Sequence, residues 1–194
     1  MHKDRIRKTQ RPIKIPSAQR LANIALYYLS RFAASEDSLR KVLQNRIRKA
    51  AMRDEAFAAD HAKHAQLRID IETIIDKHRK TGALNDAAYA EIKTRGLRRA
   101  GKSRRIIEQK LQLKGIGRDL IAKALTPEDS DTDPEIAELK AAHILARRKK
   151  LGPYRAEPAD ADRRKKDVAA MARAGFSLNL IRKVLGGEVE EEFF

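Results

Sequence analysis

Apolar residues recur along most of the chain at intervals of three and four residues. A clear example is the series Leu67, Ile71, Ile74 and Ile75. This spacing places apolar side chains along one face of an α-helix. No segment alternates convincingly with the two-residue period of a strand, and β-branched residues are sparse. The pattern therefore predicts an all-α protein.

Capping residues mark where these helices begin and end. Ser35 precedes Glu36 and Asp37, which combines an N-cap hydroxyl with acids that suit the positive end of the helix dipole. Asp133 followed by Pro134 is another helix start, because proline is tolerated at the first helical position. Glycines end several of the helices. These signals arrange the helices into three groups of three.

The third group partly repeats the second. Residues 115–125 and 175–185 share a glycine, a Leu-Ile pair, a lysine and a final leucine at matching positions. Such recurrence is typical of repeat proteins, although two similarly punctuated helices can also arise by chance. The predicted layout is a basic N-terminal arm at 1–16, a first helical repeat at 17–81 with an insertion at 48–66, a second repeat at 82–126, an acidic linker at 127–133, a third repeat at 134–187 and an acidic tail at 188–194.

The insertion at 48–66 is rich in alanine and charge and has weak apolar periodicity. It is either a helical extension or a frayed segment. Elsewhere, the helical spacing assigns particular side chains to the core. The residues predicted to face inward include Leu21, Ala25, Tyr28, Leu29, Phe32, Tyr89, Ile92, Leu111 and Leu120.

The net charge of the chain indicates what kind of molecule it binds. The chain has 43 Lys and Arg residues against 27 Asp and Glu, a formal net charge of +16. This excess predicts attraction to a polyanion, either a nucleic acid, an anionic membrane or an acidic protein surface. The absence of cysteine excludes disulfides and thiolate metal sites and suits a reducing cytoplasm. There is no apolar run of membrane-spanning length and no signal-peptide core, so we expect a cytoplasmic monomer with no membrane segment.

Basic residues are densest between Lys93 and Arg118, where ten cations face only Glu108. A solvated helix face normally carries acids that pair with its cations. Their scarcity favours contact with a polyanion over plain solvation, and two Arg-Arg-Lys-Lys segments extend the basic character into the third repeat. Aromatic residues are scarce there, which argues against base stacking at this cluster. The candidate binding residues are Arg95, Arg98, Arg99, Lys102, Arg104, Arg105, Lys110, Lys114, Arg147, Arg148, Arg163 and Arg164.

No arrangement of residues predicts catalysis. The chain has no glycine-rich phosphate loop, no paired carboxylates in a suitable context and no nucleophile elbow. His61 and His64 could share one helix face near Asp60, but nothing supplies further ligands, so surface histidines are favoured over zinc. We therefore predict no enzymatic activity, no metal and no cofactor.

The turn Gly115-Ile116-Gly117 lies between two amphipathic helices and is open to two interpretations. It looks like the helix-hairpin-helix element, whose backbone amides meet a DNA phosphate. That element places a small residue where this chain has Ile121, and the second copy, which starts at Gly175, lacks the second glycine. A helix end followed by a new N-cap explains both copies and is favoured.

The central group resembles the RecX family, bacterial regulators of the RecA recombinase. The matching residues run in the family's order, from a glycine and Leu-Asp-Asp-like segment through spaced arginines to Lys-Gly-Ile. They are Gly82, Leu84, Asn85, Asp86, Tyr89, Ala90, Arg95, Arg98, Gly101, Arg105, Ile106, Leu111, Lys114, Gly115 and Ile116. Ser35, Glu36 and Leu39 match the family's opening, and Gly175-Phe176-Ser177 matches its usual finish.

The resemblance implies an elongated, curved array of three tandem three-helix repeats. It also implies binding to the filament of RecA on single-stranded DNA, with restraint of ATP hydrolysis and strand exchange in DNA repair, recombination and the SOS response. The basic residues would then meet filament and DNA phosphate together. The alternative function is a stand-alone DNA-binding module of the helix-hairpin-helix kind.

Overall fold

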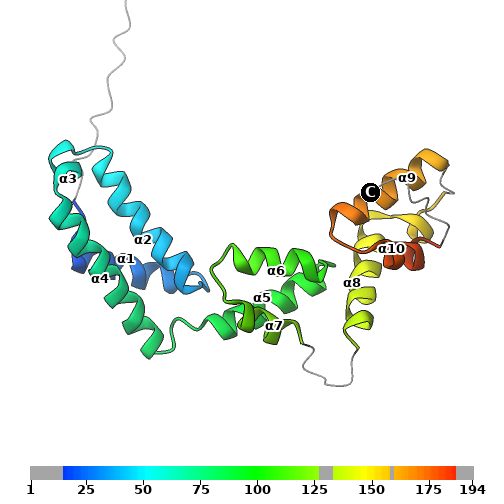
Figure 1. The fold of residues 1–194 in the computed structure, drawn as a ribbon, viewed down its shortest axis with the longest axis horizontal. Helices are drawn as coiled ribbons and strands as arrows, with labels where there is room; N and C mark the ends of the chain where they lie inside the picture. Colours follow the sequence, from blue (N-terminus) through cyan, green and yellow to red (C-terminus); the bar gives the residue numbers. More distant parts are fainter. Residues whose placement is uncertain (1–14, 127–132, 158–159, 187–194) are drawn as a thin grey trace, which may run out of the picture. The chain divides into compact units, whose positions relative to one another are not determined.

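A computed structural model describes residues 15–126, 133–157 and 160–186, and Figure 1 shows its ribbon. The chain divides into two compact units, Met1–Leu84 and Asn85–Phe194. No described residue lies in a strand, so the all-α prediction is confirmed. The described helices are α1 (Ala18–Leu29), α2 (Glu36–Ala51), α3 (Glu55–Ala59), α4 (His61–Lys80), α5 (Asp86–Arg99), α6 (Arg104–Gln112), α7 (Arg118–Leu125), α8 (Pro134–Lys149), the 3-10 helix η1 (Gly152–Tyr154), α9 (Ala161–Arg173) and α10 (Leu178–Leu185).

The basic arm, the acidic linker up to residue 132 and the acidic tail lie outside the described residues. Within the described ranges, no helix combines the length and apolar character needed to cross a membrane.

The first unit packs α1 and α2 against the long helix α4. Its core is aliphatic, and the predicted caps bind as expected: the Ser35 hydroxyl accepts from the backbone N–H of Ser38 at 3.2 Å. Capping satisfies backbone donors that a helix start would otherwise leave unpaired. The buried side chains of this core include Leu21, Ala25, Leu39, Leu43, Ile47, Phe57, Leu67, Ile71, Ile75 and Leu84.

The predicted insertion is helical. α2 continues to Ala51, α3 makes one further turn, and α4 begins at His61. Phe57 holds this segment in place, because its side chain is buried in the core and its carbonyl oxygen lies 2.9 Å from Nε2 of His64. The aromatic rings of these two residues also touch, with centroids 4.6 Å apart. A single apolar residue therefore anchors a stretch whose overall periodicity is weak.

Two bidentate ion pairs join α2 to α4. Arg40 donates two hydrogen bonds to Glu72 at 2.8 and 2.9 Å, and Arg79 donates two to Glu36 at 2.6 and 2.7 Å. The bond from Arg79 lowers the pKa of Glu36, and the bond from Arg40 lowers the pKa of Glu72. Both carboxylates are therefore more easily ionised in the folded chain than in the unfolded one.

The second unit contains two apolar clusters. The helices α5, α6 and α7 enclose the first, and the helices from α8 to α10 enclose the second. The division of the chain into three separate repeats remains a prediction. The first cluster includes Tyr89, Ala90, Ile107, Leu111, Ile116, Ile121 and Leu125, and the second includes Ala142, Leu145, Leu151, Val168, Met171, Phe176, Ile181 and Val184.

Two residues predicted to face inward are largely exposed. Phe32 lies three residues beyond Leu29, the last residue of α1, and its ring packs against that of Tyr28 and not into the core. Ile92 is 56% exposed because it lies on the side of α5 opposite the fully buried Ala90. Leu120 is only partly buried at the edge of its cluster.

The burial pattern predicts unequal effects of two leucine truncations. Leu111→Ala removes a fully buried side chain and should lower the free energy of unfolding by about 2–5 kcal/mol. Leu120→Ala should cost less than about 2 kcal/mol, because its side chain already touches water. Urea unfolding followed by circular dichroism measures both, and equal losses would contradict the observed packing.

The α2–α4 ion pairs predict sensitivity to acid. A carboxylate whose pKa is lowered by folding stabilises the fold above its unfolded-state pKa, and this stabilisation is lost as the pH falls through the folded-state pKa. For Glu36 and Glu72 the loss should therefore begin near the ordinary glutamate pKa of 4.5 and continue below it. We expect the melting temperature to fall in this range, and less steeply in the Glu36→Gln/Glu72→Gln variant. Identical pH profiles would remove these pairs as the cause.

Candidate polyanion-binding surface

Five of the candidate cations lie where α5 ends and α6 begins, and we call them the basic corner: Arg98, Arg99, Lys102, Arg104 and Arg105. The chain turns at Gly101, whose φ of +68° is strained for other residues. A Cβ atom there would also lie 2.7 Å from the backbone nitrogen of Leu145 on α8. The turn thus depends on glycine for both its conformation and its close approach to α8.

Glu138 on α8 is the main partner of the basic corner. Its carboxylate accepts a 2.5 Å hydrogen bond from the guanidinium of Arg98. The same carboxylate lies 3.0 Å from the backbone nitrogen of Arg104, at the first turn of α6. Glu138 therefore neutralises one cation and caps a helix start, two roles that the sequence analysis missed. The 40 residues that separate it from Arg98 leave no local signal of the pair.

The expectation that the basic cluster lacks internal acids is therefore partly wrong. Glu138 pairs with Arg98, and Glu108 pairs with Arg104 at 2.8 Å. The side chains of the remaining corner residues, Arg99, Lys102 and Arg105, make no ion pair with any described residue. These three cations are the part of the corner that is left to meet an external anion.

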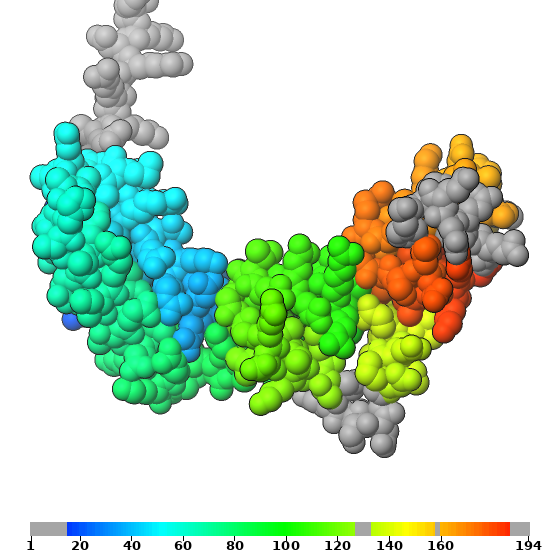
Figure 2. Space-filling view, in the orientation of Figure 1, coloured from blue at the N-terminus to red at the C-terminus, as the bar shows by residue number. Residues whose placement is uncertain are grey.

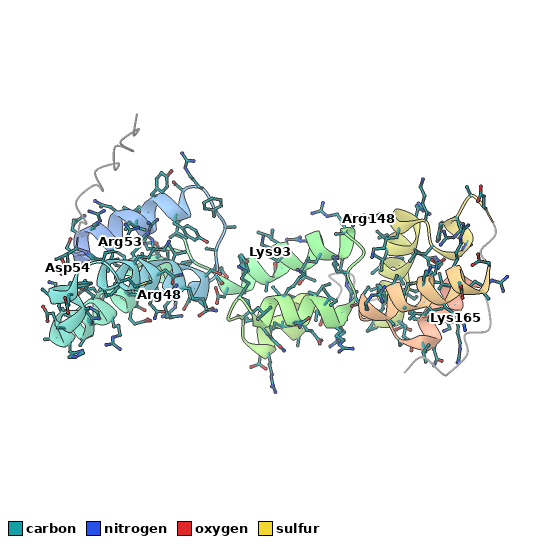
Figure 3. All side chains as sticks on the ribbon, turned by 90° about the horizontal axis from the view of Figure 1, so that it is seen from above. Arg48, Arg53, Asp54, Lys93, Arg148 and Lys165 are labelled. Carbon is teal, nitrogen blue, oxygen red and sulfur yellow. The ribbon has the colours of Figure 1, made fainter. Side chains whose placement is uncertain are left out.

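Backbone contacts hold the corner against α8 and the α9–α10 turn. The Arg148 guanidinium donates to the carbonyl oxygen of Ala100 at 2.6 Å, and Figure 3 shows Arg148 on the side of α8 nearest α5. The Ser103 hydroxyl caps α6 and donates to the carbonyl oxygen of Ala174 at 2.6 Å. Gly175 approaches so closely that a Cβ atom would lie 2.7 Å from Oγ of Ser103. In Figure 2, the atoms of α6 and α9 accordingly adjoin.

A hollow of about 780 Å³ opens beside the corner, between α5, α7 and the first turns of α8. Arg95, Arg98 and Arg99 contribute basic groups to its wall from α5, and Lys123 contributes one from α7. Glu91 is the acid on the same wall. The structure therefore brings Arg95 next to the basic corner, as the sequence analysis grouped it.

The other candidate residues are exposed but lie elsewhere on the second unit. Lys110 and Lys114 lie at the far end of α6, and Arg147 stacks its guanidinium 5.5 Å from the ring centroid of Tyr154. Arg163 and Arg164 lie on the first turns of α9. Among these cations, Arg148 contacts the basic corner, through the carbonyl oxygen of Ala100.

The two glycine turns have the geometry of helix caps. The backbone N–H groups of Gly115 and Ile116 donate to the carbonyls of Gln112 and Leu111 at 2.8 and 3.1 Å. Ile116 is buried, and Phe176 is buried at the matching position of the second turn. These two bonds are those of a helix C-cap at the end of α6, and Gly117 then begins α7 without a side-chain capping bond.

The described residues contain no group of three or more His, Asp or Glu side chains arranged to hold a metal ion. His64 contacts Phe57 instead, through its ring and through Nε2.

Comparison with known proteins gives a consistent result. The family profile described as "RecX, second three-helix domain" matches residues 85–125. The chain is 39% identical over 184 residues to the regulatory protein RecX of Myxococcus xanthus, covering 94% of this chain and 92% of that protein. It is 37% identical over 169 residues to the regulatory protein RecX of Agrobacterium fabrum, covering 87% and 83%.

Two solved structures share the fold. The crystal structure of RecX from Lactobacillus salivarius aligns with a TM-score of 0.60 at 21% identity, covering 87% of this chain and 94% of that one. A crystal structure of regulatory protein RecX aligns with a TM-score of 0.57 at 25% identity, covering 88% and 72%.

The double role of Glu138 predicts that its loss is costly. Glu138→Ala removes the partner of Arg98 and the cap of Arg104, and should lower the free energy of unfolding by about 1–3 kcal/mol. Glu108→Ala is the matched control, because its exposed pair with Arg104 should contribute about 0.5 kcal/mol or less. Chemical denaturation measures both. Equal effects would show that Glu138 acts as an ordinary surface acid.

Proposed function

The chain belongs to the RecX family of regulatory proteins, and from this premise we propose that it binds the filament of RecA on single-stranded DNA and restrains ATP hydrolysis and strand exchange. The division into three helical repeats forms part of the proposal. It is supported by the three apolar clusters of the described residues, one for each predicted group of helices.

The observation that carries the proposal is the basic corner. Arg99, Lys102 and Arg105 project from a turn that backbone contacts hold on two sides, and they make no ion pair with the described residues. Three cations on one rigid turn repel one another, and an anionic partner relieves that repulsion. Because the turn is already ordered, binding needs little additional loss of conformational freedom.

The filament offers two kinds of anion to this surface, the phosphates of DNA and the acidic side chains of RecA. Cations that neutralise phosphates release condensed counterions, so binding weakens steeply as salt rises. Ion pairs with protein carboxylates also weaken with salt, through screening, but they give no affinity for bare DNA. The two contacts can therefore be separated by comparing bare and RecA-coated DNA.

Restraint of the ATPase requires more than binding. A ligand changes an equilibrium only by the difference between its affinities for the two states. The chain must therefore bind a filament of low ATP turnover more tightly than one of high turnover. A stand-alone helix-hairpin-helix module would need two matching glycine turns, and the second turn has Ser177 in place of the second glycine.

We predict that the variant Arg99→Glu/Lys102→Glu/Arg105→Glu loses inhibition of RecA's DNA-dependent ATPase. Arg98 and Arg104 are left unchanged because they have partners inside the fold. Reversal replaces attraction by repulsion, and the concentration needed for half-inhibition should rise at least about tenfold, or about 1.4 kcal/mol. Circular dichroism should show the same helical content as the wild type.

A control of equal charge change separates this surface from net charge. Arg46, Lys49 and Arg53 are exposed residues of the first unit, and their reversal to Glu alters the net charge by the same amount. This variant should retain inhibition. If the folded corner variant inhibits as well as the wild type, the basic corner is not the contact with the filament.

A further inference from the structure

The aromatic side chains of this chain gather at an unexpected place. The chain has four tyrosines, five phenylalanines and no tryptophan, yet Tyr27, Tyr28 and Phe32 lie within six residues at the end of α1. Tyr27 is 62% exposed and Phe32 is 55% exposed. Together with Leu26, which is 58% exposed, and Arg31, we call these residues the aromatic patch.

Each exposed ring has a neighbour that fixes its position. The Arg31 guanidinium lies 4.9 Å from the ring centroid of Tyr27. The rings of Tyr28 and Phe32 have centroids 5.3 Å apart at an interplanar angle of 42°. Residues four apart meet in this way on a helical turn. The rings are therefore held in place while more than half of the surface of Tyr27 and of Phe32 remains open to water.

An open cluster of this kind needs a physical explanation. Single exposed apolar residues are common on protein surfaces, but contiguous apolar patches usually mark a binding site. The inward-facing residues of α1, Leu21 and Ala25, already fill the core of the first unit. Tyr28 packs against the edge of this core, whereas the rings of Tyr27 and Phe32 are left largely exposed.

The surrounding charge indicates which partner it fits. Among the described residues 15–35 the charged side chains are those of Arg20 and Arg31, and there is no Asp or Glu. Arg20 precedes Tyr27 by two helical turns on one face of α1, and Arg31 follows it by one. A cationic strip with aromatic rings along it suits single-stranded nucleic acid, whose phosphates meet the cations and whose bases stack on the rings.

We propose that the aromatic patch is a base-stacking site for single-stranded DNA, in which unpaired bases lie on Tyr27 and Phe32 and Arg31 adds a cation–π contact. This site belongs to the first unit and is separate from the basic corner. The expectation from the sequence that base stacking is disfavoured concerned the basic cluster alone and does not bear on this site. In taking DNA as the strand, it rests on the proposed function, but the contact itself needs no RecA.

Stacking is distinguished from charge by removing the bases and keeping the phosphates. The probes are a fluorescein-labelled thymidine oligonucleotide and an abasic oligonucleotide of the same length, titrated by anisotropy without RecA. Stacking on an aromatic side chain strengthens binding by about fivefold to about a hundredfold per base. Wild-type protein should therefore bind the thymidine strand more tightly than the abasic strand by at least fivefold, the low end of that range.

The test variant is Tyr27→Leu/Phe32→Leu, which keeps apolar bulk and removes both rings. We call the ratio of the affinities for the thymidine and abasic strands the margin. The variant should lose most of this margin, while its affinity for the abasic strand and the salt dependence of its binding stay as in the wild type. Ile69→Ala is the control, since Ile69 is a 60% exposed apolar residue of the same unit that lies outside the patch, and this variant should keep the margin. Circular dichroism confirms that both variants are folded.

Two results would overturn the proposal. The first is equal affinity of the wild-type protein for the two strands, because the bases then add nothing to binding. The second is a margin that is unchanged in the double variant, because the bases then stack elsewhere; if that variant has also lost inhibition of the RecA ATPase, the patch docks an apolar protein surface instead. Neither result depends on the basic-corner variant, so failure of the stacking site and failure of the proposed function remain distinguishable.

Discussion

The arrangement of the second unit depends on one carboxylate. Glu138 reaches from α8 to the end of α5 and the start of α6, where it meets a guanidinium and a helix N-terminus at once. Both are positive, the first by its full charge and the second through the helix dipole. Removing the carboxylate would bring Arg98 back into repulsion with its neighbours and leave a backbone donor without its acceptor. The same interaction that joins the helices therefore also sets how much of the basic corner is free to bind.

Much of the fold could be predicted from the sequence because helix signals are local. Ser35 and Asp133 cap the helices that they were expected to cap, since each side chain needs only a backbone donor two or three residues away. The same reasoning failed at Phe32, where the helix stops before the apolar series does, and at Ile92, which lies off the buried face of α5. Apolar periodicity shows which residues would share one face of a helix, but only residues inside the bounds of the helix lie on that face.

The sequence indicated where the candidate cations lie, but not which of them are paired with acids in the fold. The density of arginine and lysine indicated the junction of α5 and α6, and the structure shows this junction as an ordered turn. The contacts of this junction could not be predicted. Glu138, which neutralises Arg98, and the carbonyl of Ala174, which accepts a hydrogen bond from Ser103, come from segments that meet the corner only in the folded chain. The aromatic patch was hidden for the opposite reason. Tyr28 and Phe32 continue an apolar series, and the sequence does not show that Tyr28 packs at the edge of the core while Phe32 stays exposed.

The contacts that bind the corner to α8 and to the α9–α10 turn are made largely with the backbone. Ala100 and Ala174 each accept a hydrogen bond through the carbonyl oxygen, which every amino acid possesses. Gly101 and Gly175 lack a side chain and so allow the neighbouring segment to approach closely. Such a junction constrains few positions and leaves the alanines free to vary in evolution. The fold can therefore persist while most of the sequence drifts, in keeping with a TM-score of 0.60 to a protein that shares 21% of its residues. Sequence change in this architecture is limited less by side-chain packing between the helices than by the few places where two main chains come together.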